Sequence, residues 1–313
     1  MTPGPVYHRR LFYSIKYQLI TKYLKIVNLK PDRFQSLNRQ KLKTREMESL
    51  KDKVAVVFAA SGEIASAVAR SFARHGARVY VTGRNLDAVN KLAREIVSDD
   101  GSAIAGKVDA LNETEIDSFL QTVVDDNGKL DIVFNGIGTY YKEAGSGTPS
   151  TVATFQQFMN PLQRICGSQF LTSRAAARFM IQTGSQGTIL LFNASMAKTK
   201  TPNMAGFAAA CAAIEGLTRV LAAEFGQHGI KSICICSGAL METHKIQEMI
   251  TDFSALSGIS RSEMTANYTR FDILKSGPTL KQLGETAAFL ASENGTPFNS
   301  HIIDFDCGKF NVL

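Results

Sequence analysis

The stretch Lys53-Val-Ala-Val-Val-Phe58-Ala-Ala-Ser-Gly62-Glu-Ile-Ala65 decides the fold of this chain. Val54–Ala59 is a short apolar run, rich in β-branched residues and with little alternation, which predicts a strand buried on both faces. A helical pattern begins at Glu63 and ends before Gly76, where a helix is expected to stop. A strand followed at once by a helix is typical of the first unit of a parallel α/β sheet.

The turn between this strand and this helix contains one glycine, Gly62. A dinucleotide-binding turn needs glycine where the backbone approaches the pyrophosphate and where the helix packs on the strand. Ala59 and Ala65 are the smallest substitutes for such glycines. Glu63 argues against this function, because a carboxylate at a helix N-terminus stabilises the helix but repels a phosphate bound there. A plain strand-to-helix turn is the alternative for this segment.

The same alternation of apolar runs and helical patterns continues along the chain. We predict about seven strands, at 54–59, 78–82, 103–107, 130–135, 187–193, 231–236 and 301–305. Helices are predicted at 63–75, 86–98, 113–126, 155–182, 205–227 and 280–292. Right-handed crossovers then give an α/β fold, a Rossmann-like, doubly wound parallel sheet of strand order 3-2-1-4-5-6-7 flanked by helices. The longer connection near 241–277 is expected to cover the ligand crevice.

Charge divides the chain into a basic N-terminal extension, residues 1–50, and a single domain, residues 51–313. Residues 1–46 hold eleven Lys and Arg against Asp32 and Glu46, a net charge of +9. Because the whole chain carries +7, the remaining residues together carry −2. A near-neutral domain is not a nucleic-acid-binding domain by charge, so no nucleic-acid partner is expected.

The basic extension is expected to be flexible, and three interpretations of it stay open. Residues 11–27 are loosely amphipathic, which fits a helix that contacts a membrane surface. The same composition fits an organellar transit segment. The third interpretation gives the extension no independent role, with translation beginning at Met47.

The five cysteines are odd in number and lack C-x-x-C spacing. This indicates free thiols in a reducing compartment and predicts no metal site. No run of about 18 apolar residues occurs, so no membrane span is predicted. The first residues also lack the apolar core of a secretory signal. The expected location is therefore cytoplasmic.

The second predicted strand ends in Val81-Thr82-Gly83-Arg84-Asn85. An acidic residue at this point would accept hydrogen bonds from the ribose hydroxyls of NAD. Arg84 instead offers a guanidinium suited to a 2′-phosphate, which favours NADP(H) over NAD(H). The alternative is a solvated arginine at the start of a helix.

Residues 51–308 resemble a classical short-chain dehydrogenase/reductase over nearly their whole length. Lys53–Ala65 is similar to that family's first strand and glycine turn, and Asn135-Gly136-Ile137-Gly138 is similar to its Asn-Asn-Ala-Gly segment. Ser237–Thr243 resembles the Pro-Gly stretch and threonine that cradle the nicotinamide, and Asp306-Cys307-Gly308 resembles the terminal Asp-Gly-Gly. Each motif departs from the family's pattern, but the whole set of motifs, occurring in this order, is specific to the family.

The resemblance implies a nicotinamide cofactor, a small carbonyl or alcohol substrate, and a homo-oligomer, dimer or tetramer, assembled through the long helices. It also implies which residues contact the cofactor, with Asp109 in the position that touches the adenine. The predicted cofactor-binding residues are Ala59, Ser61, Gly62, Ile64, Arg84, Asp109, Asn135, Gly136, Gly238 and Thr243.

The family's Asn-Ser-Tyr-Lys tetrad is the point where the resemblance fails. The Asn position falls on Ile165, the Tyr position on Phe207 and the Lys position on Cys211. The Ser position falls on Ala194 or Ser195, and Ser195 is the one predicted catalytic residue. Phenylalanine cannot donate a proton, so the usual general acid is missing. Other side chains that could replace it are Lys198, Lys200, Tyr140, Tyr141, Tyr268 and His244.

The chain combines cofactor-binding motifs with an incomplete catalytic tetrad, and two functions of different classes are consistent with this combination. The first is a divergent oxidoreductase that binds NADP(H), acts on an unidentified carbonyl or alcohol substrate, and uses a non-standard proton donor or water. The alternative is a catalytically inactive protein, acting as a scaffold, as the partner subunit of an active relative, or as a nucleotide sensor.

Overall fold

The computed structural model describes residues 49–138, 143, 145–270, 273, 274 and 276–309. Residues 1–48 of the predicted extension, together with Tyr140 and Tyr141, lie outside the described residues. The described part contains Leu50, which is fully buried and whose amide donates to the carbonyl of His75 at 2.9 Å.

Seven parallel strands form one sheet in the order β3-β2-β1-β4-β5-β6-β7, which confirms the predicted fold class. The strands are β1 Val54–Phe58, β2 Arg78–Gly83, β3 Ser102–Lys107, β4 Ile132–Asn135, β5 Thr188–Ala194, β6 Lys231–Ser237 and β7 Ile302–Phe305. β1 pairs with β2 on one side and with β4 on the other, and all five of its residues are buried. The predicted strands differ from the observed ones by one or two residues at their ends.

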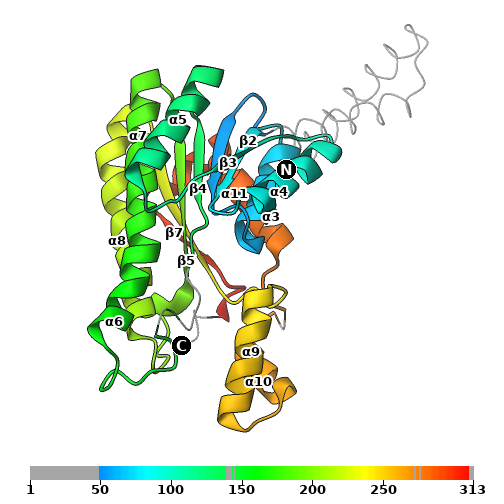
Figure 1. Cartoon of the computed structure of the whole chain (residues 1–313), viewed down its shortest axis with the longest axis vertical. Coiled ribbons are helices and arrows are strands. Elements are labelled where there is room, and N and C mark those ends of the chain that lie inside the picture. Colours follow the sequence, from blue (N-terminus) through cyan, green and yellow to red (C-terminus); the bar gives the residue numbers. More distant parts are fainter. Residues whose placement is uncertain (1–48, 139–142, 144, 271–272, 275, 310–313) are drawn as a thin grey trace, which may run out of the picture. The chain divides into compact units, whose positions relative to one another are not determined.

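Helices cover both faces of the sheet (Figure 1), with α3, α4 and α11 on one face and α5, α7 and α8 on the other. Their bounds are α3 Glu63–Arg74, α4 Leu86–Ser98, α5 Glu113–Asn127, α7 Ser168–Thr183, α8 Ala205–Phe225 and α11 Leu280–Ala291. Gly128 and Gly184 end α5 and α7 with positive φ angles of 71° and 67°, a conformation that glycine adopts without a Cβ clash.

Two helical segments differ from the prediction. The helix expected over 155–182 is divided into α6 Phe155–Pro161, a π-helix at Leu162–Gly167, and α7. Pro161 supplies the physical reason, since it has no amide hydrogen for a regular helical bond. The connection at 241–277, for which no helix was predicted, contains two helices, α9 His244–Ser257 and α10 Arg261–Thr269.

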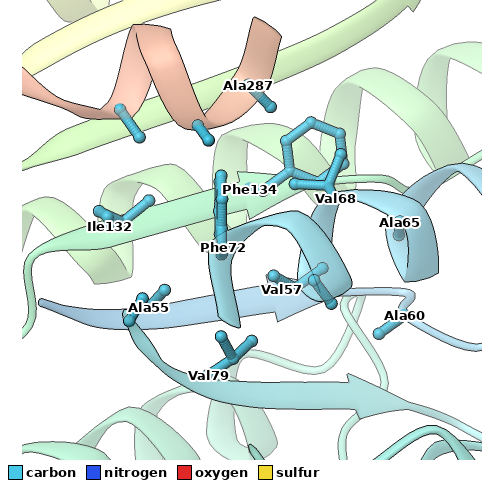
Figure 2. Packing of buried hydrophobic residues seen from close by; sticks show 14 of the residues in the cluster. Ala55, Val57, Ala60, Ala65, Val68, Phe72, Val79, Ile132, Phe134 and Ala287 are labelled. Atoms are coloured by element: carbon cyan, nitrogen blue, oxygen red, sulfur yellow. The ribbon is translucent and has the colours of Figure 1, made fainter. Parts of the chain in front are cut away.

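Side chains on β1 alternate between two apolar clusters, one on each face of the sheet. Ala55 and Val57 join the cluster under α3, α4 and α11, whereas Val54, Val56 and Phe58 join the one under α5, α7 and α8. Figure 2 shows the first cluster, to which strands β1, β2 and β4 and helices α3 and α11 contribute side chains. A strand with both faces covered needs apolar residues at every position, which explains the lack of alternation in the sequence.

α3 is held very close to the sheet at its first turn. A Cβ atom on Gly136, just after β4, would lie 2.6 Å from the Cβ of Ala65 and 3.2 Å from the carbonyl oxygen of Phe58. Only glycine fits at that point, and only a small residue fits opposite it. This contact fixes where α3 begins relative to the end of β1.

α11 in turn packs against α3 through a polar contact at the edge of the cluster. Glu285 accepts hydrogen bonds from Ser71 and Arg74 and is bonded to His75 at 2.8 Å. Burial alone would raise the pKa of Glu285, but these three partners together lower it to about 2. The carboxylate is therefore ionised at neutral pH and ties the two helices together.

One helical segment among the described residues, Ala205–His228, is long and apolar enough to span a membrane. Core helices of other proteins pass the same test, and α8, which makes up most of this segment, packs against β6. Of the most apolar window in this segment, 39% is buried inside the structure. The described residues contain no group of three or more His, Cys, Asp or Glu side chains suited to a metal ion.

Candidate active site

The turn between β1 and α3 keeps the conformation of a glycine turn although its first position is alanine. Ala59 has a φ of +57°, in the left-handed region that favours glycine. Its carbonyl accepts from the amide of Gly62 at 3.0 Å, and the amide of Ala60 donates to Thr82 on β2 at 2.7 Å. Gly62 is the N-cap of α3 and provides no side-chain cap. The first amides of α3 are therefore left for another acceptor.

Ser61 and Arg84 lie together at the carboxyl ends of β1 and β2. A Cβ atom on Gly83, the residue before Arg84, would be 3.3 Å from the hydroxyl oxygen of Ser61. Both side chains are exposed, and Arg84 takes part in no ion pair within the described residues. Asn85 caps α4 by accepting from the amide of Ala88 at 3.1 Å. The Ser61 hydroxyl thus lies beside the end of β2, where Arg84 follows Gly83 in the sequence. A hydroxyl and a guanidinium are side chains suited to a phosphate group.

Asp109 and Asn135 differ in how far they face solvent. Asp109 is half-buried at the end of β3, and its Oδ1 accepts from the amide of Leu111 at 3.0 Å. Asn135 is fully buried, and its amide nitrogen donates to the hydroxyl of Ser173 at 3.2 Å while the hydroxyl of Thr172 donates to its Oδ1. Asn135 therefore links β4 to α7 by its side chain.

Glu63 makes a contact that the sequence did not reveal. Its Oε2 accepts from the backbone amide of His244, the first residue of α9, at 2.9 Å. Thr243, the N-cap of α9, donates its hydroxyl to the carbonyl of Leu240 at 2.8 Å and does not cap the helix. The charge of Glu63 is evident from the sequence, but only the fold brings its carboxylate to a residue 181 positions away.

Gly238 and Thr243 lie in the segment that leads from β6 to α9. The amide of Gly238 donates to Phe305 at the end of β7 at 3.0 Å, and a Cβ on Gly238 would be 3.3 Å from the Cβ of Asp306. Thr243 is buried, with 4% of its surface exposed. The predicted nicotinamide-cradling segment is thus packed against the predicted terminal Asp-Gly-Gly motif.

The position of the family's lysine is occupied by a buried, neutral thiol. Cys211 lies on α8 with 1% of its surface exposed. Burial raises the pKa of this thiol to about 11, although the backbone groups of Ala194 and Met196 hydrogen-bond to the sulfur and oppose the shift. The carbonyl of Cys211 accepts from Asn193 at 3.0 Å. This residue packs α8 onto the end of β5 and supplies no positive charge.

Phe207 lies one helical turn before Cys211, half-buried against the apolar cluster of α5, α7 and α8. It has no exchangeable proton, so the phenol that the family uses is absent. Ile165, in the Asn position, is 4% exposed and lies within the π-helix. Three of the four tetrad positions therefore hold side chains that cannot exchange a proton at neutral pH.

Ser195 is the remaining predicted catalytic residue. It is 5% exposed, its hydroxyl donates to the carbonyl of Ser237 on β6 at 2.9 Å, and the thiol of Cys236 lies 3.8 Å from its oxygen. This bond ties the ends of β5 and β6 together. Ser195 can accept a further hydrogen bond, but it can donate one to a ligand only after leaving Ser237.

The candidate replacements for the missing acid are engaged elsewhere or exposed. Lys198 forms an ion pair with Asp304 on β7. Burial raises the pKa of Tyr268, whose hydroxyl lies 3.8 Å from the sulfur of Met249 on α9. Lys200 and the His244 side chain are exposed. Tyr140 and Tyr141 lie outside the described residues.

The first prediction concerns the strained turn at Ala59. Ala59→Gly is expected to raise the free energy of unfolding by about 0.5–1 kcal/mol, because glycine adopts positive φ without a Cβ clash. Chemical denaturation followed by circular dichroism measures this. Ala60→Gly is the matched control and is expected to lower stability, since Ala60 is fully buried and has no positive φ. Equal losses in the two variants would contradict strain at Ala59.

The second prediction concerns the thiols. Cys211, Cys234 and Cys236 are at most 1% exposed, and burial raises the pKa of each. A disulfide reagent at pH 8 is therefore expected to label no more than two of the five cysteines in the folded protein, and all five in denaturant. Cys211→Ser should leave the native count unchanged and reduce the denatured count by one. Loss of a fast-reacting thiol in that variant would show that Cys211 is reactive.

Comparisons with known proteins agree with the observed fold. A protein-family model described as "Enoyl-(Acyl carrier protein) reductase" matches residues 59–309. The probable 2,4-dienoyl-CoA reductase, (2E)-enoyl-CoA-producing, of Bacillus subtilis is 26% identical over 263 residues, which cover 83% of this chain and 98% of the relative.

Solved structures give the same result for the fold. Sorbitol-6-phosphate 2-dehydrogenase from Erwinia amylovora matches with a TM-score of 0.76 at 25% identity, covering 82% of this chain and 98% of that chain. A variant of the actinorhodin polyketide ketoreductase with NADPH matches with a TM-score of 0.75 at 20% identity, over 83% of this chain and 97% of that chain. The family model spans most of the chain, and the sheet order agrees with it, so this protein belongs to the short-chain dehydrogenase/reductase family.

Proposed function

We propose that this chain is a divergent oxidoreductase of the short-chain family that binds NADP(H) and works without the family's phenol and ammonium. Members of the family bind NAD or NADP. The choice of NADP(H) is supported by the exposed Arg84 at the end of β2 and by Ser61, whose hydroxyl would lie 3.3 Å from a Cβ on the adjacent Gly83. An exposed guanidinium and a hydroxyl at the end of β2 suit the 2′-phosphate that distinguishes NADP(H) from NAD(H).

The residues around the turn fit a dinucleotide in most respects. The start of α3 has no side-chain cap from Gly62, so its amides suit a diphosphate. In this proposal Ile64 lies beside the diphosphate, Asp109 contacts the adenine, and Gly238 and Thr243 hold the nicotinamide end. Gly136 keeps the crevice narrow by allowing α3 to approach β4. Glu63 is the one residue whose charge opposes the ligand.

The nicotinamide cofactor, when bound, supplies a hydride to a carbon atom of the substrate. Reduction of a ketone or aldehyde also needs a proton on oxygen, and a positioned general acid typically accelerates that transfer by about 10²–10⁴-fold. Phe207 and the neutral Cys211 provide no such acid. Some substrates receive their final proton on a carbon atom, and water can deliver it. The reduction of such a substrate depends less on the missing general acid.

A conjugated carbon–carbon double bond meets that requirement, and we propose an α,β-unsaturated carbonyl compound as the substrate class. Hydride addition to its β-carbon leaves the negative charge delocalised onto the carbonyl oxygen, and water then protonates the α-carbon. The family model is described as an enoyl reductase, and the Bacillus relative is described as a dienoyl-CoA reductase. Ser195 is the residue we assign to the carbonyl oxygen, after its hydroxyl turns away from Ser237.

A second candidate is a protein without catalytic activity, acting as a scaffold, a partner subunit or a nucleotide sensor. The simultaneous presence of Ile165, Phe207 and Cys211 at tetrad positions favours it, because each is buried or half-buried and packs the fold. Assembly through the long helices fits either candidate. α7 and α8 expose apolar side chains, namely Phe170, Ile181 and Val220, at 41%, 41% and 54%. A cytoplasmic location is part of both proposals.

The third prediction tests the nucleotide. Arg84→Ala is expected to weaken NADPH binding by about tenfold to a hundredfold, the loss typical of a charge-assisted hydrogen bond, and to leave NADH binding nearly unchanged. The fluorescence of the bound reduced nicotinamide measures both. Arg94→Ala is the matched control, since Arg94 is also exposed but lies on α4 beyond the turn. Equal weakening of NADPH and NADH by Arg84→Ala would contradict a contact with the 2′-phosphate.

The fourth prediction tests the chemistry. The wild-type protein with NADPH is expected to reduce an α,β-unsaturated carbonyl compound and to leave saturated ketones unreduced. The double variant Phe207→Tyr, Cys211→Lys is expected to gain ketone reduction of at least about 10²-fold over the wild type, because it restores a general acid beside a cation. Oxidation of NADPH followed at its absorbance maximum measures both reactions.

Two controls separate the outcomes of that assay. Phe225→Tyr places a phenol at the far end of the same helix and should gain nothing. The single variant Phe207→Tyr is tested as well, because a lysine at the buried position 211 could unfold the double variant. Efficient ketone reduction by the wild type would contradict the proposed substrate class. A wild type that is inactive on both substrates, with a double variant that gains ketone reduction, would favour the non-catalytic candidate.

A further inference from the structure

The contact between Glu63 and α9 carries an inference beyond the fold and the family. Glu63 lies in the first turn of α3, and its carboxylate is bonded to the amide of His244, the first residue of α9. One carboxylate therefore lies against the N-termini of two helices. Each N-terminus carries a partial positive charge of about half a unit, so an anion at this point is stabilised by both.

The neighbouring caps explain why this acceptor is needed. Gly62 offers α3 no side-chain acceptor. The hydroxyl of Thr243 donates to the carbonyl of Leu240 and therefore does not cap α9. The amide of His244 would otherwise depend on solvent, because the first amides of a helix have no partner within the helix. Glu63 thus acts as the cap of α9 from a distant part of the chain.

We propose that Glu63 is an affinity-determining residue, an internal anion that competes with the nucleotide diphosphate for the N-terminal ends of α3 and α9. This inference rests on the proposed binding of NADP(H). A diphosphate bound at the start of α3 brings negative charge beside a carboxylate, and two like charges at close range repel each other. Binding therefore requires Glu63 to leave the amide of His244 or to be neutralised in place.

The account makes Glu63 act in opposite directions in the two states. Without nucleotide it stabilises the protein by bridging α3 and α9. With nucleotide it opposes binding. A residue with a purely structural role would lower both stability and affinity when replaced, whereas the replacement of Glu63 should lower the first and raise the second.

The chain contains a matched control for this test. Glu242 makes the same type of contact, since its carboxylate accepts from the amide of Leu280, the first residue of α11. Both carboxylates are exposed, and both bind the first amide of a helix. Glu242 belongs to the β6–α9 connection and Glu63 to the turn of α3, so only Glu63 is expected to oppose a diphosphate.

The fifth prediction compares Glu63→Gln and Glu242→Gln with the wild type in the full-length chain. Calorimetric titration with NADPH is expected to show about threefold to thirtyfold tighter binding for Glu63→Gln, the range for removing an unfavourable charge at a helix end, and no change for Glu242→Gln. Adenosine 2′-monophosphate is the second probe. It carries the 2′-phosphate but no diphosphate, so its affinity should be the same in all three proteins.

A thermal denaturation without nucleotide gives the independent measurement. Both glutamine variants are expected to melt about 1–3 °C below the wild type, because each loses a charged cap. A Glu63→Gln protein that melts lower yet binds NADPH more tightly has the two opposite effects that the proposal requires. Equal NADPH affinity in Glu63→Gln and the wild type would overturn the inference and leave the proposed function standing.

The remaining outcomes are also decisive. If both variants bind NADPH more tightly by the same factor, the effect is one of general charge and the inference is overturned. If the wild type does not bind NADPH but Glu63→Gln does, the inference is supported and the proposed function fails for the native chain. If neither protein binds NADPH while both bind adenosine 2′-monophosphate, both proposals are overturned.

Discussion

The close approach of α3 to the sheet is the constraint on which the site depends. Gly136 and Ala65 meet at a distance that admits no larger side chain, and this contact fixes the start of α3 at the carboxyl end of β1. The left-handed conformation of Ala59 follows from the same geometry, because the chain must reverse within a few residues to enter the helix. The backbone of a dinucleotide turn is thus kept with alanine in two positions that favour glycine.

The predicted cofactor-binding residues and the predicted tetrad positions differ in the kind of side chain that they hold. At the ends of β1 and β2, Ser61 and Arg84 offer exposed polar side chains. At the predicted tetrad positions, Phe207 is a half-buried aromatic ring and Cys211 is a buried neutral thiol. Under the proposed function, nucleotide binding and proton transfer therefore depend on different residues. Glu63 differs from both groups, because its carboxylate accepts a hydrogen bond from the first amide of α9.

Much of the fold could be predicted from the sequence, because strands buried on both faces leave continuous apolar runs such as Val54–Phe58. The order of the strands followed from short connections and right-handed crossovers. The π-helix after Pro161 was missed, since a proline within a helical pattern does not say how the next turn will adjust. α9 and α10 were not predicted, because a long connection has no fixed geometry.

The sequence indicates which elements carry the candidate site residues, but it does not contain the contacts that these residues make. The sequence placed Ser195 and Cys211 in the catalytic region, yet the bond from Ser195 to Ser237 depends on the register between β5 and β6. The bond from Glu63 to His244 depends on the path of the whole chain between them. Contacts between residues that are distant in sequence are set by packing, which local patterns do not contain.

The most direct test of the account is calorimetric titration of the wild-type protein with NADPH. The account predicts saturable binding of one nucleotide per chain, with NADPH bound more tightly than NADH. Absence of heat and of saturation at millimolar NADPH, in protein shown to be folded by circular dichroism, would contradict it.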